Sequence, residues 1–281
     1  MKGHPFYRVL WASVNTLLVA SLVLLVVGLV WEYSTRRYLQ GFADAVVPLS
    51  DNPEQKVEAI LAWMEHGPAR RTTKNPEELA LRDPHTTLNY EQLLKVCGTA
   101  TNAFVNLAAS SGLDSRRLLL LSADGGSKHV VAEVYLDGRW VVADPAFHRL
   151  FRDAQGRTVT RYQLQEPQVW QQATSVVPNY PAIYTYERTV HVRLSRIPYA
   201  GRYLRKTLDK IFPGWEEAFD WTLLLERESL AFTFAAAALV LAALMGRLVL
   251  GWYGRRRLGI ERVRLRDQLW QAGKALLQQS R

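Results

Sequence analysis

The chain has 281 residues, which is enough for one medium-sized domain with accessory segments. Its single cysteine, Cys97, excludes an intrachain disulfide. Six scattered histidines and one cysteine show no metal-ligand spacing, and no glycine-rich loop is suited to a phosphate. We therefore expect neither a metal nor another cofactor.

Two apolar runs do not fit a soluble core. Residues 9–31 carry no charge and are long enough to cross a bilayer core of about 30 Å. This run is too long for a cleaved signal peptide and is followed by bulky residues, which favours an uncleaved anchor. A second run, residues 230–250, is interrupted only by Arg247, which can snorkel to the headgroups. A buried core helix is the alternative for each run.

The formal net charge of +9 arises largely from the C-terminal tail. Six arginines follow the second run: Arg255, Arg256, Arg257, Arg262, Arg264 and Arg266. Because basic residues flank spans on the cytoplasmic side, the tail is expected in the cytoplasm, and with two spans the N-terminus lies there too. No nucleic-acid motif accompanies the charge, so we expect contact with lipid headgroups and not with nucleic acid.

These features predict a two-pass protein of the cytoplasmic membrane. Its parts are a cytoplasmic N-terminus (1–8), a span (9–31), an extracytoplasmic domain (32–229), a second span (230–250) and a basic cytoplasmic tail (251–281). Within the domain we expect a core over residues 54–164 and a membrane-proximal extension over 165–229.

The domain begins with helical patterns. Residues 53–66 have apolar residues at helical spacing and end at Gly67-Pro68. Residues 89–110 predict a second helical region, which Cys97-Gly98 interrupts near its middle, with Thr99 as a plausible cap for the new helix. A cysteine near a helix N-terminus has a lowered pKa, since the helix dipole favours the thiolate. The alternative is that Cys97 is a small buried hydrophobic residue.

Strand patterns follow. Residues 117–122 predict a short strand, and residues 128–136 and 139–143 predict a hairpin around the Asp137-Gly138 turn. Residues 151–164 are typical of another strand pair, and residues 165–200 have little periodicity. Residues 213–228 predict an amphipathic helix, either at the membrane interface or packed on the domain. The order of helices and then strands indicates an α+β fold.

Two segments, KVCGTATNAFVNLAASSGLDSRRLLLLS and KHVVAEVYLDGRWVVADPAF, resemble the transglutaminase-like branch of the papain-like cysteine enzymes. The resemblance covers roughly residues 90–164. It implies an α+β core in which the helix bearing the cysteine packs on an antiparallel sheet, here between two transmembrane helices. It also implies that Cys97 is the nucleophile, His129 the general base and acid, and Asp144 the carboxylate that orients the histidine.

The sequence departs from the family pattern at three places. Lys95 stands where glycine is common, residues 113–116 lack the family's proline, and Val131 replaces a frequent tryptophan beside the histidine. The last change concerns the wall that faces the substrate. His85 and His148 are rival bases.

The oxyanion hole of such a site should combine the backbone N–H of Cys97 with a second donor. Gln92 and Tyr90 are the candidates, and the sequence does not choose between them.

The resemblance implies a membrane-anchored acyl-transfer enzyme that works through a thioester. It would hydrolyse or cross-link extracytoplasmic peptide, protein or cell-wall amides. The alternative is a catalytically silent module that binds or assembles components for cell-envelope or exopolysaccharide processes. A third option, acyl transfer to arylamines, fits poorly with two membrane anchors. The expected partners are membrane lipids, the substrate and an envelope assembly partner.

Overall fold

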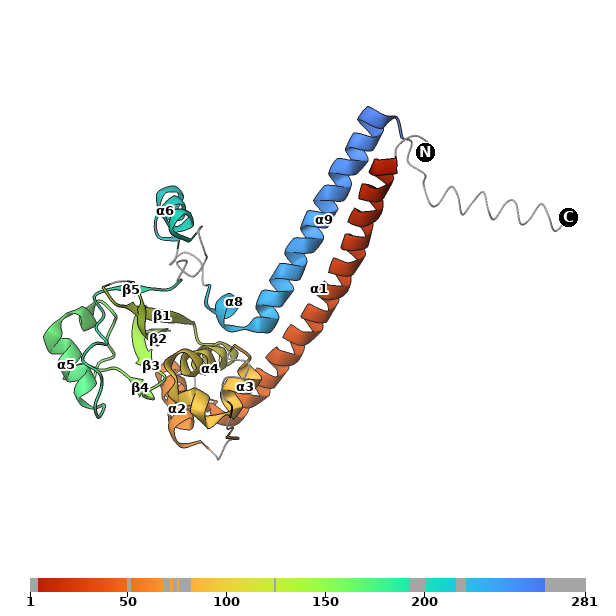
Figure 1. Ribbon diagram of the computed structural model, residues 1–281. Coiled ribbons are helices and arrows are strands. Elements are labelled where there is room, and N and C mark those ends of the chain that lie inside the picture. The colour runs from red at the N-terminus through yellow and green to blue at the C-terminus, as the bar shows by residue number, and fades with distance from the viewer. Residues whose placement is uncertain are drawn as a thin grey trace. The chain divides into compact units, whose positions relative to one another are not determined.

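The computed structural model describes residues 5–49, 52–67, 71–72, 75, 82–123, 125–192, 201–215 and 221–260. The chain divides into two compact units (Figure 1). One contains residues up to Gly28 together with those from Thr233 onward, and the other contains Leu29–Phe232.

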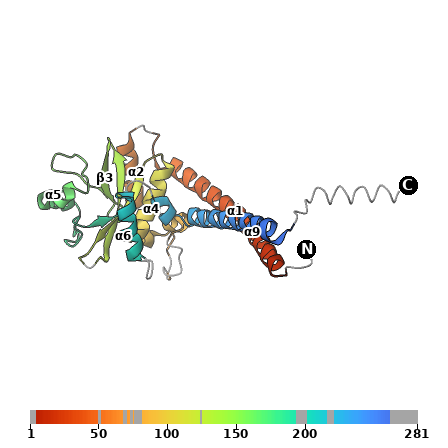
Figure 2. The same ribbon diagram turned by 90° about the horizontal axis from the view of Figure 1, so that it is seen from above.

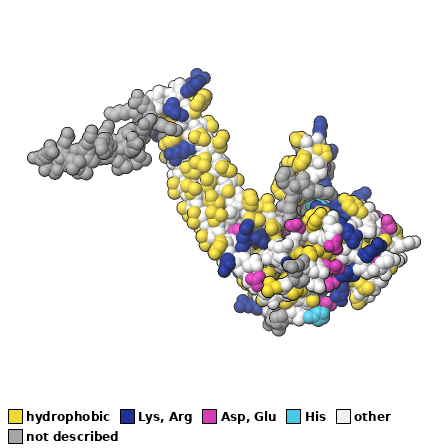
Figure 3. Space-filling view, turned by 180° about the vertical axis from the view of Figure 1, so that it is seen from behind, with side chains coloured by type: hydrophobic (Ala, Val, Ile, Leu, Met, Phe, Trp, Pro, Cys, Tyr) yellow, Lys and Arg dark blue, Asp and Glu magenta, His cyan; other side chains and the backbone are white. Residues whose placement is uncertain are grey.

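The first unit is formed by parts of two long helices, α1 (Pro5–Val46) and α9 (Glu228–Leu258). Each is long and apolar enough to cross a membrane, and they contain the two predicted runs. Leu18 of α1 packs with Val240 and Ala243 of α9, while most of the other apolar side chains on both helices are exposed (Figure 3). Helices that are apolar on all sides need an apolar environment such as lipid.

The helix α1 is longer than the predicted run, because it continues for fifteen residues beyond Trp31 to Val46. In this continuation Leu39 and Ala43 are buried, and Leu39 joins the core of the second unit. The sequence signal for a span ended where charges begin, but charged residues such as Glu32 and Arg36 are good helix formers and do not end a helix.

The second unit is an α+β domain, which confirms the predicted fold class. Its helical part consists of α2 (Pro53–His66), α3 (Pro84–Asn89), the short 3-10 helix η2 (Glu91–Lys95) and α4 (Cys97–Ser110). Five antiparallel strands follow in the spatial order β4-β3-β2-β1-β5. They are β1 (Ser115–Leu121), β2 (Ser127–Leu136), β3 (Arg139–Asp144), β4 (Arg149–Leu150) and β5 (Thr189–Val190).

Local signals explain most of these elements. The side chain of Asn52 caps α2, Pro53 occupies its first turn and Gly67 follows its end, so the predicted bounds are confirmed. The hairpin of β2 and β3 is also confirmed. Its turn residues Asp137 and Gly138 both have positive φ, at 48° and 80°, as a tight two-residue hairpin requires.

The predicted helical region over residues 89–110 is corrected in two ways. Its first part is a 3-10 helix, and α4 begins at Cys97 and not at Thr99. The Thr99 hydroxyl donates backward to the carbonyl oxygens of Leu93 and Val96 and therefore does not cap the helix. This places Cys97 at the first position of α4.

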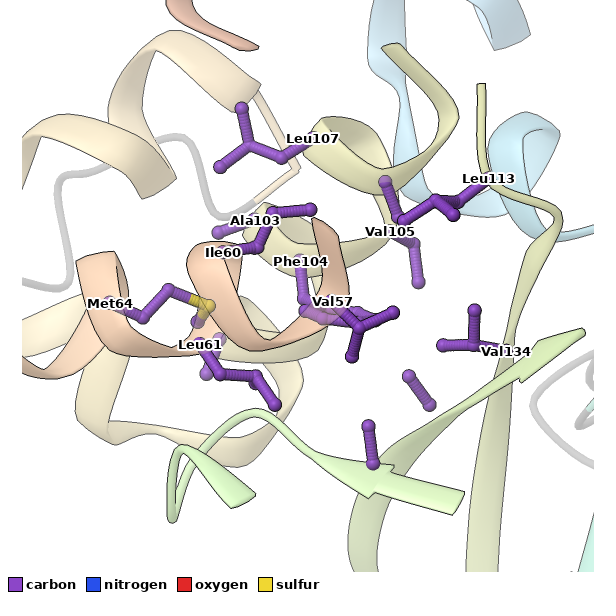
Figure 4. Packing of buried hydrophobic residues seen from close by; sticks show 14 of the residues in the cluster. Val57, Ile60, Leu61, Met64, Ala103, Phe104, Val105, Leu107, Leu113 and Val134 are labelled. Carbon is purple, nitrogen blue, oxygen red and sulfur yellow. The ribbon is translucent and has the colours of Figure 1, made fainter. Parts of the chain in front are cut away.

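The sheet is covered on both faces (Figures 1 and 2). On one face α2 and α4 form the main core with Ala132, Val134 and Val141 (Figure 4). On the other face Val131 and Val142 pack with residues of α5 (Pro167–Ser175) and with the fully buried Tyr186. The alternation of neighbouring residues between the two cores fixes the register of β2 and β3.

The C-terminal part of the domain differs most from the prediction. The strand pair expected over residues 151–164 is wrong, because these residues, all of them described, contain as β structure just an isolated bridge between Arg152 and Thr158, and the short strand β4 lies before them. The helices α5 and α6 (Gly201–Ile211) were not predicted. Of the helix expected over residues 213–228, the structure contains α8 (Thr222–Glu226), while residues 216–220 lie outside the described residues.

Candidate active site

Cys97 is half-buried at the N-terminus of α4. It follows Val96, whose apolar side chain cannot cap the helix, so the first N–H groups of α4 are available to other acceptors. The backbone N–H groups of Gly98 and Val130 form hydrogen bonds to the thiol sulfur. The site therefore offers the sulfur both the positive end of a helix and two direct donors.

His129 lies near the start of β2 and is buried with 2% of its surface exposed. Its Nε2 atom is 2.7 Å from Oδ2 of Asp144, which ends the neighbouring strand β3. The Thr101 hydroxyl of α4 donates to the carbonyl oxygen of Val130 over 3.1 Å. This bond ties the helix that bears Cys97 to the strand that bears His129.

Asp144 is completely buried and accepts hydrogen bonds on both oxygens. The backbone N–H of Ala146 donates to Oδ1 over 3.2 Å, and the Tyr180 hydroxyl donates to Oδ2 over 3.0 Å. A carboxylate fixed in this way can orient the imidazole and determine which ring nitrogen carries the proton. Because Nε2 is engaged with Asp144, Nδ1 is the nitrogen available to the thiol.

The electrostatics of the site favour a charged pair. Burial disfavours the imidazolium, but the hydrogen bond to Asp144 and the charges of Asp144 and the nearby Cys97 outweigh it and raise the pKa of His129 to about 9. Burial likewise opposes the thiolate, but the hydrogen bond and charge of His129 lower the pKa of Cys97. The two shifts together favour thiolate and imidazolium near neutral pH.

An aromatic wall covers His129. The ring of Tyr184 stacks on the imidazole with centroids 4.1 Å apart and planes at 2°. Phe147 and Tyr180 contact the imidazole edge-on, at 5.9 and 6.4 Å. Val131, which replaces the family's tryptophan, is instead buried in the core beneath α5.

Sequence reasoning missed Tyr180 and Tyr184, which lie in the segment of little periodicity after α5. The only available signal was composition, because three tyrosines occur within residues 180–186.

The structure brings Cys97, His129 and Asp144 together, and the two rival bases have other surroundings, although the charge of Asp144 reaches His148. His85 stacks on Tyr38 of α1, with centroids 3.8 Å apart. Burial lowers the pKa of His148, which occupies a turn with φ of 55°. Neither histidine interacts with the thiol in the way that His129 does.

The two oxyanion candidates lie directly before α4. Gln92 is part of η2, and Tyr90 joins α3 to η2. The backbone of Tyr90 is already engaged, because its N–H donates to Thr86 over 3.2 Å and its carbonyl accepts from Leu93 over 3.0 Å. Only the side chain of Tyr90 therefore stays a candidate. The role of either residue stays a prediction.

A second histidine–carboxylate pair lies on the same face of the sheet. His191 Nε2 is 2.8 Å from Oε2 of Glu133, which is four residues after His129 on β2. Arg116 contacts the same carboxylate at 2.8 Å and Arg161 approaches it at 3.8 Å. All four residues are buried, and the two arginines supply more positive charge than the single negative charge of Glu133.

Within the described ranges, no group of three or more His, Cys, Asp or Glu side chains is arranged to hold a metal ion. A hollow of about 390 Å³ lies between the end of α1, Lys56 of α2, and Ser110 and Ser111 at the end of α4. Because Cys97 begins α4 and these serines lie at its other end, the hollow is separate from the thiol.

A family model described as the transglutaminase-like superfamily matches residues 40–145. No curated protein and no solved structure matches the chain. The matched residues include Cys97, His129 and Asp144, whereas Tyr180 and Tyr184 lie beyond them.

Proposed function

We propose that this protein is a membrane-anchored cysteine acyl-transfer enzyme, since residues 40–145 match the model of the transglutaminase-like superfamily. One observation supports the proposal most. Cys97 at the start of α4 interacts with a buried imidazole that is itself held by Asp144 at 2.7 Å. A nucleophile, a base and a group that orients the base are the minimum set for covalent catalysis at an acyl carbon.

In the proposed acylation step, the Cys97 thiolate attacks the carbonyl carbon of an amide. The carbon–sulfur bond forms, and the carbonyl oxygen becomes an oxyanion. When the carbon–nitrogen bond breaks, imidazolium of His129 gives its proton to the departing nitrogen. The products are a free amine and a thioester on Cys97, and His129 is left neutral.

In the proposed second step, neutral His129 removes a proton from water or from a second amine as that group attacks the thioester. Water gives a carboxylic acid, and an amine gives a new amide. In both cases the sulfur leaves as thiolate and His129 is again protonated, so the starting pair is restored.

The oxyanion of each step needs preorganised donors. The free N–H of Cys97 at the helix N-terminus is suited to this role. The side chain of Gln92 or of Tyr90 would supply the second donor. Loss of one such donor in other acyl-transfer enzymes costs about 10²–10³-fold in rate.

The proposed substrates are peptide, protein or cell-wall amides outside the cytoplasm. The two apolar helices and the Arg-rich end of α9 support a two-pass topology with both termini in the cytoplasm. Reporter fusions at Gln40 and at Arg281 test this arrangement. A fusion at Arg281 that reports the outer side would overturn it.

Labelling of the full chain in membranes with a peptide-like electrophile tests the chemistry. Wild-type protein should be labelled at Cys97, and His129→Ala should lose most of the labelling. His85→Ala is the matched control and should be labelled like the wild type. Identification of the product released from candidate peptides then separates hydrolysis from cross-linking. A folded wild-type protein whose Cys97 stays unlabelled would refute the proposal.

A catalytically silent binding module is the second candidate. It is favoured by the position of the hollow between α1, α2 and the end of α4, because a ligand held there would not touch Cys97. A silent module predicts an unreactive thiol, so the same labelling experiment distinguishes the two functions.

A further inference from the structure

The short helix α6 (Gly201–Ile211) has one apolar and one basic side. With 100° between successive residues, Leu204, Leu208 and Ile211 fall within one narrow arc. Arg205, Lys206 and Lys210 fall on the opposite half of the helix, together with Asp209. Apolar and charged residues are separated more sharply on α6 than on α2, α4 or α5.

The apolar side of α6 is not covered by the domain. Ile211 is 75% exposed, Leu204 is 40% exposed and Leu208 is half-buried, and Phe212 directly after the helix is 44% exposed. Figure 3 shows hydrophobic side chains at the surface of this helix. A monomeric soluble domain rarely exposes several large apolar side chains on one short helix, so this side is expected to have a partner.

The composition of α6 indicates which partner it fits. The sequence of α6 contains four basic residues and one acidic residue, Asp209. The Asp209 carboxylate already accepts from the Trp215 indole N–H over 3.0 Å and pairs with Arg205 at 3.8 Å. A helix with this pattern can bury its apolar side at the acyl boundary while its basic side chains reach anionic headgroups. A protein groove would have to be apolar and acidic at once.

We propose that α6 docks on the surface of an anionic lipid bilayer, the same bilayer that α1 and α9 are proposed to cross. Residues 212–227 separate α6 from α9, and a segment of that length reaches at most about 55 Å when extended. The helix is therefore tethered close to a membrane. The inference rests on the proposed anchoring and does not depend on acyl transfer.

Docking of α6 would add a third contact between the domain and the membrane. Each basic side chain near an anionic surface strengthens the association roughly fivefold at ordinary salt. The contact would restrict how the domain is oriented above the lipid. It would thereby favour substrates that lie at, or are attached to, the membrane surface.

Depth-dependent quenching of a fluorophore in the full chain tests the proposal. Single cysteines are introduced as Ile211→Cys and Lys206→Cys in a Cys97→Ser background and labelled with an environment-sensitive dye. The protein is reconstituted in phosphatidylcholine vesicles, with and without phosphatidylglycerol, that carry quenchers on their acyl chains. The dye at position 211 should be quenched several-fold more than the dye at position 206.

Charge dependence is the second part of the test. The combined change Arg205→Gln, Lys206→Gln and Lys210→Gln should remove most of the quenching at position 211 in phosphatidylglycerol vesicles. High salt should have the same effect on the unmodified helix.

A dye at Leu241→Cys separates the failure of this inference from the failure of anchoring, since Leu241 lies in α9 and is 63% exposed. If position 241 is quenched and position 211 is not, α6 does not dock on lipid and the inference is wrong. If neither is quenched, the anchoring itself is wrong. Shielding of position 211 from water without quenching would indicate a protein partner and would also overturn the inference.

Discussion

Two buried histidine–carboxylate pairs lie on one face of the sheet, and they differ in what surrounds them. His129–Asp144 and His191–Glu133 have nearly equal separations of 2.7 and 2.8 Å. Both use a residue of β2, at positions 129 and 133. The distance between the histidine nitrogen and the carboxylate oxygen would therefore assign the same role to both pairs.

The charges around the carboxylates separate the two pairs. Burial disfavours ionised Glu133, but His191, Arg116 and Arg161 together lower its pKa. Asp144 is instead held by neutral donors from Tyr180 and Ala146. Its negative charge therefore acts mainly on His129 and contributes to the pKa of about 9.

The different surroundings of the two carboxylates indicate which histidine can exchange a proton with a neighbouring side chain. In the Glu133 cluster the carboxylate faces two arginines and a histidine and is held as in a structural ion-pair network. In the Asp144 pair the second ring nitrogen faces a thiol that can itself change charge. We infer that the His191–Glu133 pair stabilises the sheet and that the His129–Asp144 pair takes part in the proposed chemistry.

The largest expected effect is on stability, from Glu133→Gln. This change keeps the shape of the side chain but leaves Arg116 and Arg161 as buried cations without a counter-charge. Breaking a buried ion pair in this way costs about 3–5 kcal/mol in free energy of unfolding. Urea unfolding of the detergent-solubilised protein measures it.

The matched control is Asp144→Asn, the same acid-to-amide change in the other pair. It should cost clearly less, because His129 can lose its proton and leave no buried charge. Equal losses for the two variants would contradict the distinction between the pairs.

The pH dependence of that stability follows from the pKa of Glu133. Its pKa is lowered in the folded protein, so its contribution is present above the unfolded value of about 4.3 and is lost as pH falls through the folded value. Glu133→Gln should therefore flatten the acid side of the stability profile.

The next largest effect concerns thiol reactivity. His129→Ala should lower the rate of iodoacetamide alkylation of Cys97 at pH 6 by about 10²-fold, since a thiol with an ordinary pKa of about 8.5 is almost wholly protonated there. His191→Ala is the control from the second pair and should leave the rate unchanged. A wild-type profile with its midpoint near the ordinary value, unmoved by His129→Ala, would leave Cys97 as a core residue.

A smaller effect is expected on the titration of His129 in Asp144→Asn. The hydrogen bond and charge of Asp144 raise the pKa of this imidazole, so their loss should lower it from about 9 towards the ordinary value of about 6.5. NMR of histidine-labelled protein follows this titration without any knowledge of the substrate. Glu133→Gln should leave the His129 signal in place, and a His129 pKa that stays near 9 in Asp144→Asn would contradict the assignment.

Much of the domain was predictable because its signals are local. The Asp137-Gly138 turn fixes the hairpin, and Asn52-Pro53 and Gly67 fix α2. The positions of Cys97, His129 and Asp144 came from the resemblance, since no local pattern links residues 97 and 129 in space.

The aromatic wall and the second pair could not be predicted for a physical reason. Tyr180, Tyr184 and His191 come from a stretch whose regular structure is limited to the two-residue strand β5, and its path is decided by packing against α5 and pairing with β1. Periodicity carries no information on such a segment. The continuation of α1 to Val46 was missed although its residues are good helix formers, because the prediction followed the apolar run and stopped where that run ends.

The smallest expected effect comes from removing the hydroxyl of a tyrosine beside each pair, Tyr180 next to Asp144 and Tyr162 next to Arg161. Tyr180→Phe removes the hydroxyl that donates to Asp144 over 3.0 Å, in a half-buried site. A hydrogen bond to a charged group is worth about 1.5–3 kcal/mol, and here the lower end applies because His129 and Ala146 still hold the carboxylate. The variant should stay folded.

Tyr162→Phe is the matched change on the other pair, because the Tyr162 hydroxyl accepts from Arg161 over 2.6 Å. Tyr162 is 61% exposed, so water can replace its hydroxyl and the loss should stay within about 0.5 kcal/mol. Alkylation of Cys97 separates structure from chemistry. Tyr180→Phe leaves Asp144 less firmly held and should make the rate at pH 6 fall a few-fold, whereas Tyr162→Phe should leave it unchanged. Equal rates in the two variants would mean that Tyr180 contributes only to the fold. The hydrogen bond from Tyr180 to Asp144 would then have no effect on the reactivity of Cys97.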